Sequence, residues 1–304
     1  MADLKVNIAG VSFKNPLITA SGTFGFGREY SEFYPLSKLG GISCKGLTLR
    51  VRDGNPPPRI AETAGGMLNS VGLQNPGVDY FIKNELPWLK KQGTVIIANV
   101  AGSTVEDYCE TAERLDGTGI DMVELNISCP NVKQGGVQFG TTCGGVESVT
   151  SAVRRRCKKP LMVKLSPNVS DITETAAAAE SAGADAVSMI NTLTGMKIDI
   201  NTRRPVLRNN TGGLSGPAVL PVAVRMVWQA HKRVKIPIIG MGGISKWQDA
   251  VEMLLAGASA VQVGTAVFSD PYAPLKILDG LLKYLDVNGI GSVSELTGAA
   301  LDWD

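Results

Sequence analysis

The chain repeats one pattern many times: a short apolar run is followed by a segment whose apolar residues recur at helical spacing. This alternation predicts parallel strands joined by crossover helices. Most runs are apolar at consecutive positions, as expected of strands that are covered on both faces. The pattern therefore favours a barrel or a doubly wound sheet. Eight runs fit it: Pro16–Ala20, Gly41–Lys45, Thr94–Val100, Met122–Ile127, Leu161–Leu165, Ala186–Asn191, Ile236–Met241 and Ala260–Val263.

Amphipathic segments separate these runs, and helix-start residues such as Ser103, Asp171 and Ser245 precede several of them. Eight strands with their helices fill the 304 residues, and α/β barrels of about 250 residues commonly fold as one domain. We predict a single α/β domain over residues 1–304, a (β/α)8 TIM barrel. The clearest helical segments are Thr104–Leu115, Val146–Cys157, Ile172–Ala182, Val219–His231 and Lys246–Ala256.

Three further segments complete the predicted architecture. Leu4–Phe13 has Gly10 between two short apolar stretches, which predicts a hairpin that caps the barrel bottom. Two connections, from Thr48 to about Val78 and from Leu193 to about Gly216, are too long for simple turns. Both follow strands, so we expect them to roof the active site at the C-terminal face. The Pro56–Pro58 tract leaves a disordered linker as an alternative for the first.

Charge and hydropathy argue against nucleic acid and membranes as partners. The formal net charge is +2, and the densest basic stretch, Arg154–Lys159, is short and lies at the end of a predicted helix. The N-terminus carries no signal-peptide pattern, and no apolar run reaches the roughly 18 residues of a membrane span. We expect a cytoplasmic protein.

Few residues are available for metal or nucleophilic chemistry. The five cysteines contain no CxxC pair, so neither a zinc ribbon nor an iron–sulfur site is indicated, and we expect no metal. His231 is the only histidine, and it lies in a predicted helix where a structural role is the simpler interpretation. A Ser-His-Asp triad or a His general base would have to use this one residue.

Glycines follow the last two predicted strands directly, in Gly240-Met-Gly-Gly243 and at Gly264. Loops after strands seven and eight of a barrel commonly bind phosphate, because glycines let backbone N–H groups approach the anion. Neither a Walker A loop nor a dinucleotide-binding GxGxxG unit is present. The ligand is therefore a phosphorylated substrate or a mononucleotide such as FMN. Lys164, at the end of strand five, is costly to bury unpaired, which favours a ligand role.

Strand four leads into Asn126-Ile-Ser-Cys129-Pro-Asn131, which places Asn126 at the strand end and Cys129 in the following loop. A thiolate in a loop can abstract a carbon-bound proton when its pKa lies near the working pH. Amide side chains gather at other predicted strand ends and roof loops, and they match the alternating donors and acceptors of a pyrimidine edge. These are Asn69, Asn99 and Asn191, with Lys45 and Thr192 beside them.

The segments AsnIleSerCysProAsn (126–131) and AsnSerValGlyLeuGlnAsn (69–75), together with the two late glycine loops, resemble dihydroorotate dehydrogenase over essentially the whole chain. In that family, cysteine in the loop after strand four marks class 1, whereas the membrane-associated class 2 has serine. Lys133–Gly140 resembles the B-type of class 1. The resemblance implies an FMN-dependent enzyme of pyrimidine (UMP) biosynthesis that oxidises dihydroorotate to orotate.

The resemblance also implies roles for individual residues. Cys129 would take the C5 proton of dihydroorotate while C6 delivers hydride to flavin N5. The substrate would be held by Lys45, Asn69, Ser70, Val71, Gly72, Leu73, Asn126, Asn191 and Thr192. FMN would be held by Ser21, Lys45, Gly46, Asn99, Asn126, Lys164, Ile190, Gly216, Gly242, Gly243, Gly264 and Thr265.

The B-type likeness implies a partner, an iron–sulfur flavoprotein with FAD and a 2Fe-2S cluster that passes electrons to NAD. A homodimer of this chain would form the core of a heterotetramer. Other functions stay open: an A-type homodimer that uses fumarate, a related flavin barrel that reduces pyrimidines, and a redox-silent phosphate-binding lyase or isomerase with Lys164 as a Schiff-base or polarising residue. A non-catalytic binding barrel is a further alternative, which the cysteine, lysine and four amides at predicted strand ends disfavour.

Overall fold

The computed structural model describes residues 2–128 and 139–303. Within them, eight parallel strands close into a barrel, which confirms the predicted fold. Each strand lies inside one of the eight apolar runs. In barrel order they are β3 (Leu17–Thr19), β4 (Gly41–Ser43), β7 (Val95–Val100), β8 (Met122–Asn126), β9 (Leu161–Lys164), β10 (Ala186–Met189), β15 (Ile238–Met241) and β16 (Ala260–Val263).

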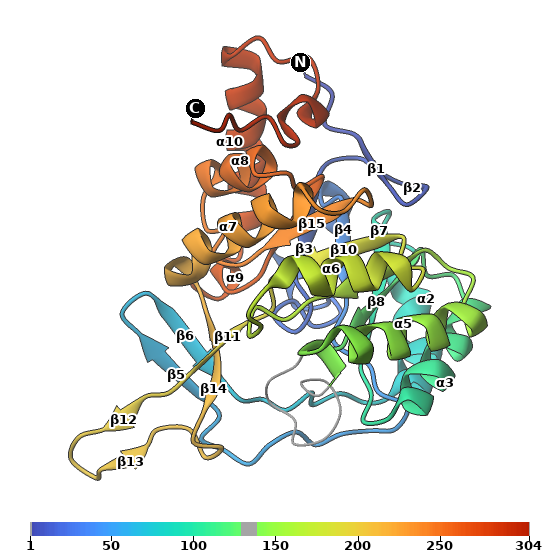
Figure 1. Ribbon diagram of the computed structural model, residues 1–304, viewed down its shortest axis with the longest axis vertical. Helices are drawn as coiled ribbons and strands as arrows, with labels where there is room; N and C mark the ends of the chain where they lie inside the picture. Colours follow the sequence, from blue (N-terminus) through green and yellow to red (C-terminus); the bar gives the residue numbers. More distant parts are fainter. Residues whose placement is uncertain (1, 129–138, 304) are drawn as a thin grey trace.

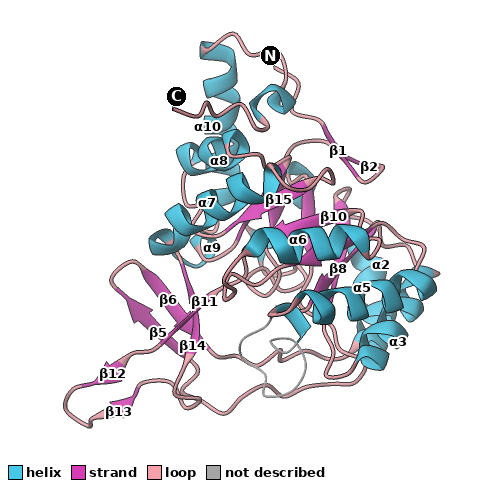
Figure 2. Cartoon of the chain, viewed as in Figure 1, coloured by secondary structure: helices cyan, strands magenta, loops and turns pink. Residues whose placement is uncertain are grey.

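Helices surround this barrel, and consecutive long helices pack side by side (Figure 2). All five predicted helical segments are helices. The longer ones are α3 (Val105–Asp116), α5 (Cys143–Arg156), α6 (Ile172–Ser181), α7 (Leu220–His231), α8 (Trp247–Leu255) and α10 (Ala273–Val287). The shorter ones are α1 (Val78–Tyr80) and α2 (Leu86–Leu89), joined by a π-helical segment, and α9 (Ala266–Ser269).

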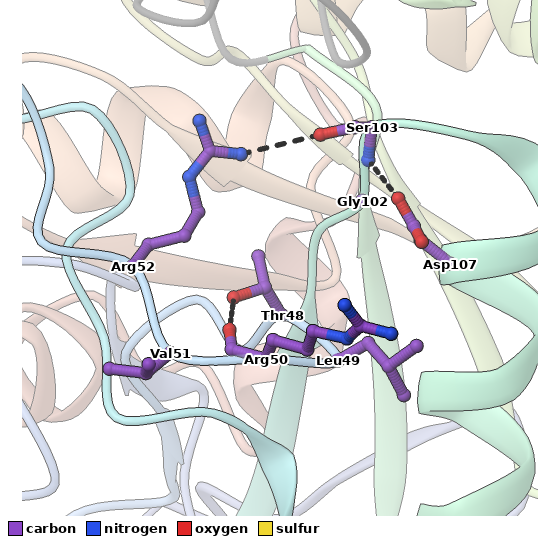
Figure 3. Close-up of a pocket in the computed structure, with 8 residues that line it drawn as sticks. All are labelled: Thr48, Leu49, Arg50, Val51, Arg52, Gly102, Ser103 and Asp107. Atoms are coloured by element: carbon purple, nitrogen blue, oxygen red, sulfur yellow. Dashed lines mark hydrogen bonds between the residues drawn. The ribbon is translucent and has the colours of Figure 1, made fainter.

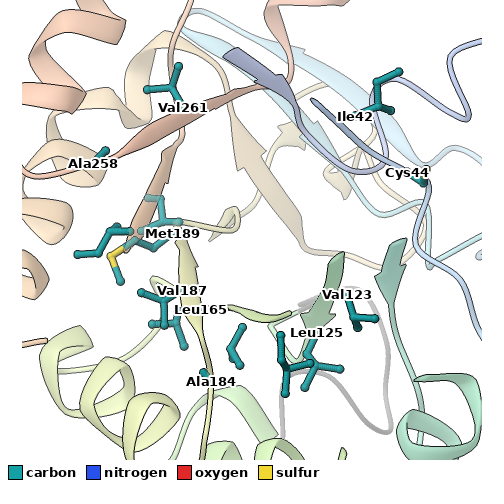
Figure 4. Packing of buried hydrophobic residues seen from close by; sticks show 14 of the residues in the cluster. Ile42, Cys44, Val123, Leu125, Leu165, Ala184, Val187, Met189, Ala258 and Val261 are labelled. Carbon is teal, nitrogen blue, oxygen red and sulfur yellow. The ribbon is translucent and has the colours of Figure 1, made fainter. Parts of the chain in front are cut away.

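The main hydrophobic core lies between the strands and the helices. Outward-facing strand residues such as Ile42, Val123 and Val261 are fully buried there (Figure 4). Val146 and Val149 of α5 belong to the same cluster. Because both faces of each strand are covered, the strands read as continuous apolar runs.

A second, smaller core fills the lower half of the barrel interior. It contains the inward-facing residues near the strands' N-terminal ends, and the hairpin of β1 (Val6–Ile8) and β2 (Val11–Phe13) closes it from below. Ile8 and Phe13 of the hairpin are fully buried in this cluster, which confirms the predicted cap. We call the strand residues of this cluster the lower layers: Ile18, Ile97, Met122, Met162, Ala186, Ile239 and Ala260.

The two long connections meet in one antiparallel sheet at the other side of the molecule (Figure 1). Its strands are β5 (Ile60–Thr63) and β6 (Gly66–Asn69) from the first connection, and β11 (Leu193–Gly195) and β14 (Gly212–Ser215) from the second. Between β11 and β14, the pair β12 (Ile198–Asp199) and β13 (Arg204–Pro205) projects outward as an arm. The first connection therefore contains a hairpin rather than a linker.

Candidate active site

A layer of polar side chains lies directly above the lower layers. Ser43, Glu124, Ser188 and Gln262 come from β4, β8, β10 and β16, which are alternate strands of the barrel. Each is two residues beyond an inward-facing position of its strand, so the period of two turns it into the barrel. All four are buried, with at most 1 % exposure. We call them the polar layer.

Glu124 is the centre of the polar layer. One carboxylate oxygen, Oε2, accepts hydrogen bonds from Ser43 and from Asn99, both at 2.6 Å. The other, Oε1, accepts from Ser188 at 2.7 Å and from Gln262 at 3.0 Å. Burial acts to raise the pKa of this carboxyl, but the nearby Lys164 ammonium and the hydrogen bonds outweigh it, so the net pKa is lowered. Glu124 therefore stays charged inside the barrel.

Above this layer, three of the predicted amides, Asn99, Asn126 and Asn191, form one connected network. Asn126 Nδ2 donates to Asn99 Oδ1 at 3.3 Å, and Asn191 Nδ2 donates to Asn126 Oδ1 at 3.3 Å and to Ser128 Oγ at 2.8 Å. The backbone N–H of Thr192 donates to Asn191 Oδ1 at 2.8 Å. Lys164, 5 % exposed, lies at the end of β9, whose register pairs it with Asn126 and Ser188. The strand ends therefore bring these predicted residues together.

The sheet of the two long connections carries further predicted residues to the same place. Asn69, at the end of β6, pairs with Gly213 of β14, whose Cα approaches the Thr192 side chain so closely that a Cβ there would clash with it. Val71 is partly buried, Ser70 and Gly72 are buried, and Leu73 has a positive φ of 59°. The Leu73 side chain approaches Gly46, which also lies against Asn99 Oδ1. Lys45 precedes Gly46 in the loop after β4.

The predicted phosphate loops lie next to each other, because β15 and β16 are paired strands. Gly242 and Gly243 follow β15 with φ of +115° and +81°, conformations that favour glycine. A Cβ at Gly242 would touch Ile190, and Gly264 lies beside Ala20, next to Ser21. Thr265 precedes α9. Gly216 packs against Gly66 of β6, in the sheet of the two long connections.

Two surface cavities lie near the loops after β3 and β4. The smaller, of ≈ 330 Å³, is lined by residues 48–52 and by the start of α3, and it contains none of the predicted residues (Figure 3). The larger, of ≈ 660 Å³, is lined by Lys45 together with residues of the loop after β3, including Gly22 and Phe26. Of the predicted residues, Lys45 therefore lines this larger cavity.

Comparison with known proteins identifies the family. The sequence profile described as dihydroorotate dehydrogenase matches residues 3–285. The chain is 55% identical over 298 residues to the catalytic subunit of dihydroorotate dehydrogenase B (NAD(+)) from Petrotoga mobilis, covering 98% of this chain and 99% of that one. The protein of the same name from Parabacteroides distasonis is 58% identical over 300 residues, with 98% of both chains covered. The chain belongs to the dihydroorotate dehydrogenase family.

A solved structure supports this family assignment at the level of the fold. The crystal structure of the enzyme from Eimeria tenella in complex with ferulenol superposes with a TM-score of 0.80 and 25% identity, covering 98% of this chain and 88% of that chain. Membership in the dihydroorotate dehydrogenase family removes the phosphate-binding lyase from the alternatives. Within the described residues, no helix has the length and apolar character to cross a membrane.

Cys129, the predicted base, lies outside the described residues. His231 is the last residue of α7 and packs against Gly257 and Gly298. This packing agrees with a structural role.

The sequence analysis missed Glu124, although the sequence held a signal for it. One acidic residue stands at an inward position of an apolar strand, where an unpaired charge is costly.

Proposed function

We propose that this chain oxidises dihydroorotate to orotate in pyrimidine biosynthesis, with FMN as its cofactor and NAD as the final electron acceptor through a partner subunit. The observation that carries the proposal is the 55–58% identity, over nearly the full chain, to proteins named as catalytic subunits of dihydroorotate dehydrogenase B (NAD(+)). The layered polar interior below the strand ends supports it, because a barrel without chemistry would fill those positions with apolar side chains.

The residues at the barrel mouth fit FMN. Its flat ring system carries polar atoms along one edge, which suits the buried amides of Asn99 and Asn126 and the Lys164 ammonium. Its phosphate suits the two adjacent glycine loops, where Gly242, Gly243 and Gly264 are partly exposed just after the strands end. When bound, FMN supplies the capacity to accept two electrons. Ser21, Lys45, Gly46, Ile190, Gly216 and Thr265 complete the proposed cofactor set.

We assign the substrate to the amide network and the loop above it. Lys45, Asn69, Asn126, Asn191 and Thr192 would bind the polar edges and the carboxylate of dihydroorotate, and residues 70–73 would close over it. N–H groups and the lysine ammonium provide donors for the substrate's carbonyl and carboxylate oxygens.

Cys129 is the proposed base that removes the C5 proton. Burial raises the pKa of the thiols of Cys44 and Cys109, and it raises that of Cys157 to about 11. A thiol whose pKa is raised so far contributes little thiolate near neutral pH and makes a poor base. Cys129 follows β8 by three residues in the sequence, directly after the strand that carries Glu124 and Asn126.

The partner follows from the same names. A catalytic subunit requires another subunit, for which we propose an iron–sulfur flavoprotein carrying FAD and a 2Fe-2S cluster, bound to a homodimer of this chain in a heterotetramer. The competing assignment is an A-type enzyme that reduces fumarate and needs no partner. The B-type names of the relatives favour the first. A cytoplasmic location stays a prediction.

An anaerobic visible spectrum tests the proposed function. The purified chain should show FMN absorbance that bleaches when dihydroorotate is added. An FMN-containing protein that does not bleach would contradict the substrate, and a chain that cannot be loaded with FMN would contradict the cofactor. Reoxidation by fumarate, without a second protein, would replace the B-type assignment with the A-type.

A further inference from the structure

The orientation of each amide at the barrel mouth is determined from both ends of the network. At the lower end, the charged Glu124 carboxylate only accepts hydrogen bonds, so Asn99 must turn its NH2 group toward it, and does so at 2.6 Å. At the upper end, the Thr192 backbone N–H only donates, so Asn191 must turn its oxygen toward it, at 2.8 Å.

The links between these two ends agree with both. With its NH2 group on Glu124, Asn99 presents Oδ1 to the NH2 group of Asn126, at 3.3 Å. Asn126 then presents Oδ1 to Asn191, at 3.3 Å, and to the Ser128 hydroxyl, at 3.4 Å. In the series from Glu124 to Asn191, every amide therefore turns its NH2 group toward Glu124 or the next residue on that side and its oxygen toward Thr192. Reversing one amide would bring two donors or two acceptors together, at a cost comparable to an unsatisfied buried group.

This direction decides what Asn126 offers to a ligand. Its oxygen accepts from two donors, Asn191 and Ser128. Among the residues that the structure describes, only one of the two N–H bonds of its NH2 group has an acceptor, Asn99 Oδ1. Asn126 thus faces the mouth as a hydrogen-bond donor. That suits a ligand edge of carbonyl or carboxylate oxygens.

We propose that Glu124 is a positioning residue: from below the site, through Asn99, it orients Asn126 as a donor toward the oxygen atoms of orotate and dihydroorotate. This inference rests on the proposed function. It assigns Glu124 no contact with the ligand. The proposed role requires that the group beneath Asn99, 2.6 Å from its NH2 nitrogen, accepts a hydrogen bond and cannot donate one.

The matched comparison uses two variants of the polar layer. Glu124→Gln keeps size and shape but supplies an NH2 group, so both directions of the amide chain become possible. Ser188→Ala removes a different hydrogen bond to the same carboxylate, at 2.7 Å on Oε1, and leaves the amide chain untouched. Orotate affinity of the FMN-loaded proteins is measured by the change in flavin absorbance, and FMN affinity of the apoproteins by quenching of flavin fluorescence.

We expect Glu124→Gln to bind orotate roughly 10- to 100-fold more weakly, as expected when a hydrogen bond to a charged group is lost. Ser188→Ala should stay within about threefold of the wild type, since its bond lies outside the chain. Glu124→Asp, which still only accepts, should recover most of the orotate affinity. A structural role alone would lower the unfolding temperature of Glu124→Gln and leave the orotate affinity of the folded protein unchanged, which would overturn the inference.

The remaining outcomes also decide between the two proposals. Failure of the wild type to bind orotate would overturn the proposed function itself, whereas normal binding by both the wild type and Glu124→Gln would overturn only the role of Glu124. If Glu124→Gln does not fold, Asn99→Leu serves instead, because its side chain is similar in size but can neither donate to Glu124 nor accept from Asn126. Orotate affinity equal to that of the wild type in that variant would overturn the inference.

Discussion

The lower and upper halves of the barrel interior are built on the same eight strands, yet they hold opposite kinds of side chain. The lower layers are apolar and closed by the β1–β2 hairpin, with every member at most 1 % exposed. Two residues further along four of the strands, Ser43, Glu124, Ser188 and Gln262 follow a glycine, a methionine and two alanines, and the amides and Lys164 lie above them. On β7 the change takes one step, from Ile97 to Asn99.

This contrast separates two uses of one scaffold. Apolar layers stabilise the barrel through burial, at about 25 cal/mol per Å² of apolar surface. Polar layers contribute less net stability, because each buried polar group must first lose its water. Their value lies in fixed orientation: a carboxylate with four described donors leaves the amides above it little freedom. Substitutions in the two halves should therefore have different signatures.

The largest expected effect is at Cys129, the proposed base. Cys129→Ala should retain FMN and bind orotate but reduce the flavin with dihydroorotate about 10²- to 10⁴-fold more slowly or worse, because the proposed base is lost. Stopped-flow absorbance without oxygen measures the rate. Cys143→Ala, which removes another thiol of the described chain, is the control and should react normally. Near-normal reduction by Cys129→Ala would rule out the assigned base.

Lys164→Met, in the upper half, should lower both the stability of the protein and its affinity for FMN. It leaves the buried Glu124 carboxylate without the neighbouring ammonium that helps to lower its pKa, so the free energy of unfolding should fall. FMN affinity should fall as well. Urea unfolding and flavin retention measure the two effects, with the exposed Lys158→Met as control. Full FMN loading together with unchanged stability would contradict both the proposed FMN-binding role of Lys164 and its effect on Glu124.

Ile97→Ala tests the lower layers on the same strand that carries Asn99. Removing this fully buried side chain should cost about 2–5 kcal/mol of unfolding free energy, from lost burial and the cavity left behind. FMN and orotate affinity of the folded protein should not change. Urea unfolding and ligand titration report both quantities. A large loss of orotate affinity would mean that the two halves are not separable.

Acid should weaken the polar layer by itself. The pKa of Glu124 is lowered in the folded chain, below its usual value of 4.5, so its contribution to stability is present above that value and is lost as the pH falls toward the folded pKa. The wild type should therefore lose more unfolding free energy below pH 4.5 than Glu124→Gln, which cannot titrate. Identical acid dependence of the two proteins would contradict this ionisation.

The smallest effect is expected outside both halves. Arg114 and Asp79 form an ion pair at 2.6 Å on the outer surface, with side chains 43% and 72% exposed. Solvent screens such pairs, so Arg114→Ala should change the unfolding free energy by at most about 1 kcal/mol. Urea unfolding supplies this baseline for the interior variants. A loss of unfolding free energy as large as that of Ile97→Ala would show that the losses measured for the interior variants cannot be attributed to burial.

Much of the fold could be predicted because strand and helix periods are local properties. All eight barrel strands, five helices and the capping hairpin lie where the apolar pattern predicts them. The polar candidates at strand ends also follow from local position, since parallel strands bring their carboxyl ends to one face. Asn99, Asn126 and Asn191 are examples: their positions at predicted strand ends were enough to predict that they lie together, without knowledge of their hydrogen bonds.

Tertiary structure alone decided how these residues act together. The Ser43–Glu124 and Glu124–Gln262 hydrogen bonds join residues 81 and 138 positions apart, and no local pattern encodes a contact of that kind. The same holds for the sheet that pairs Asn69 with Gly213, 144 positions away. The sequence determined which faces of each strand are polar, because side-chain direction alternates along it. Barrel closure decided which polar groups meet, because only closure fixes the distances across the interior.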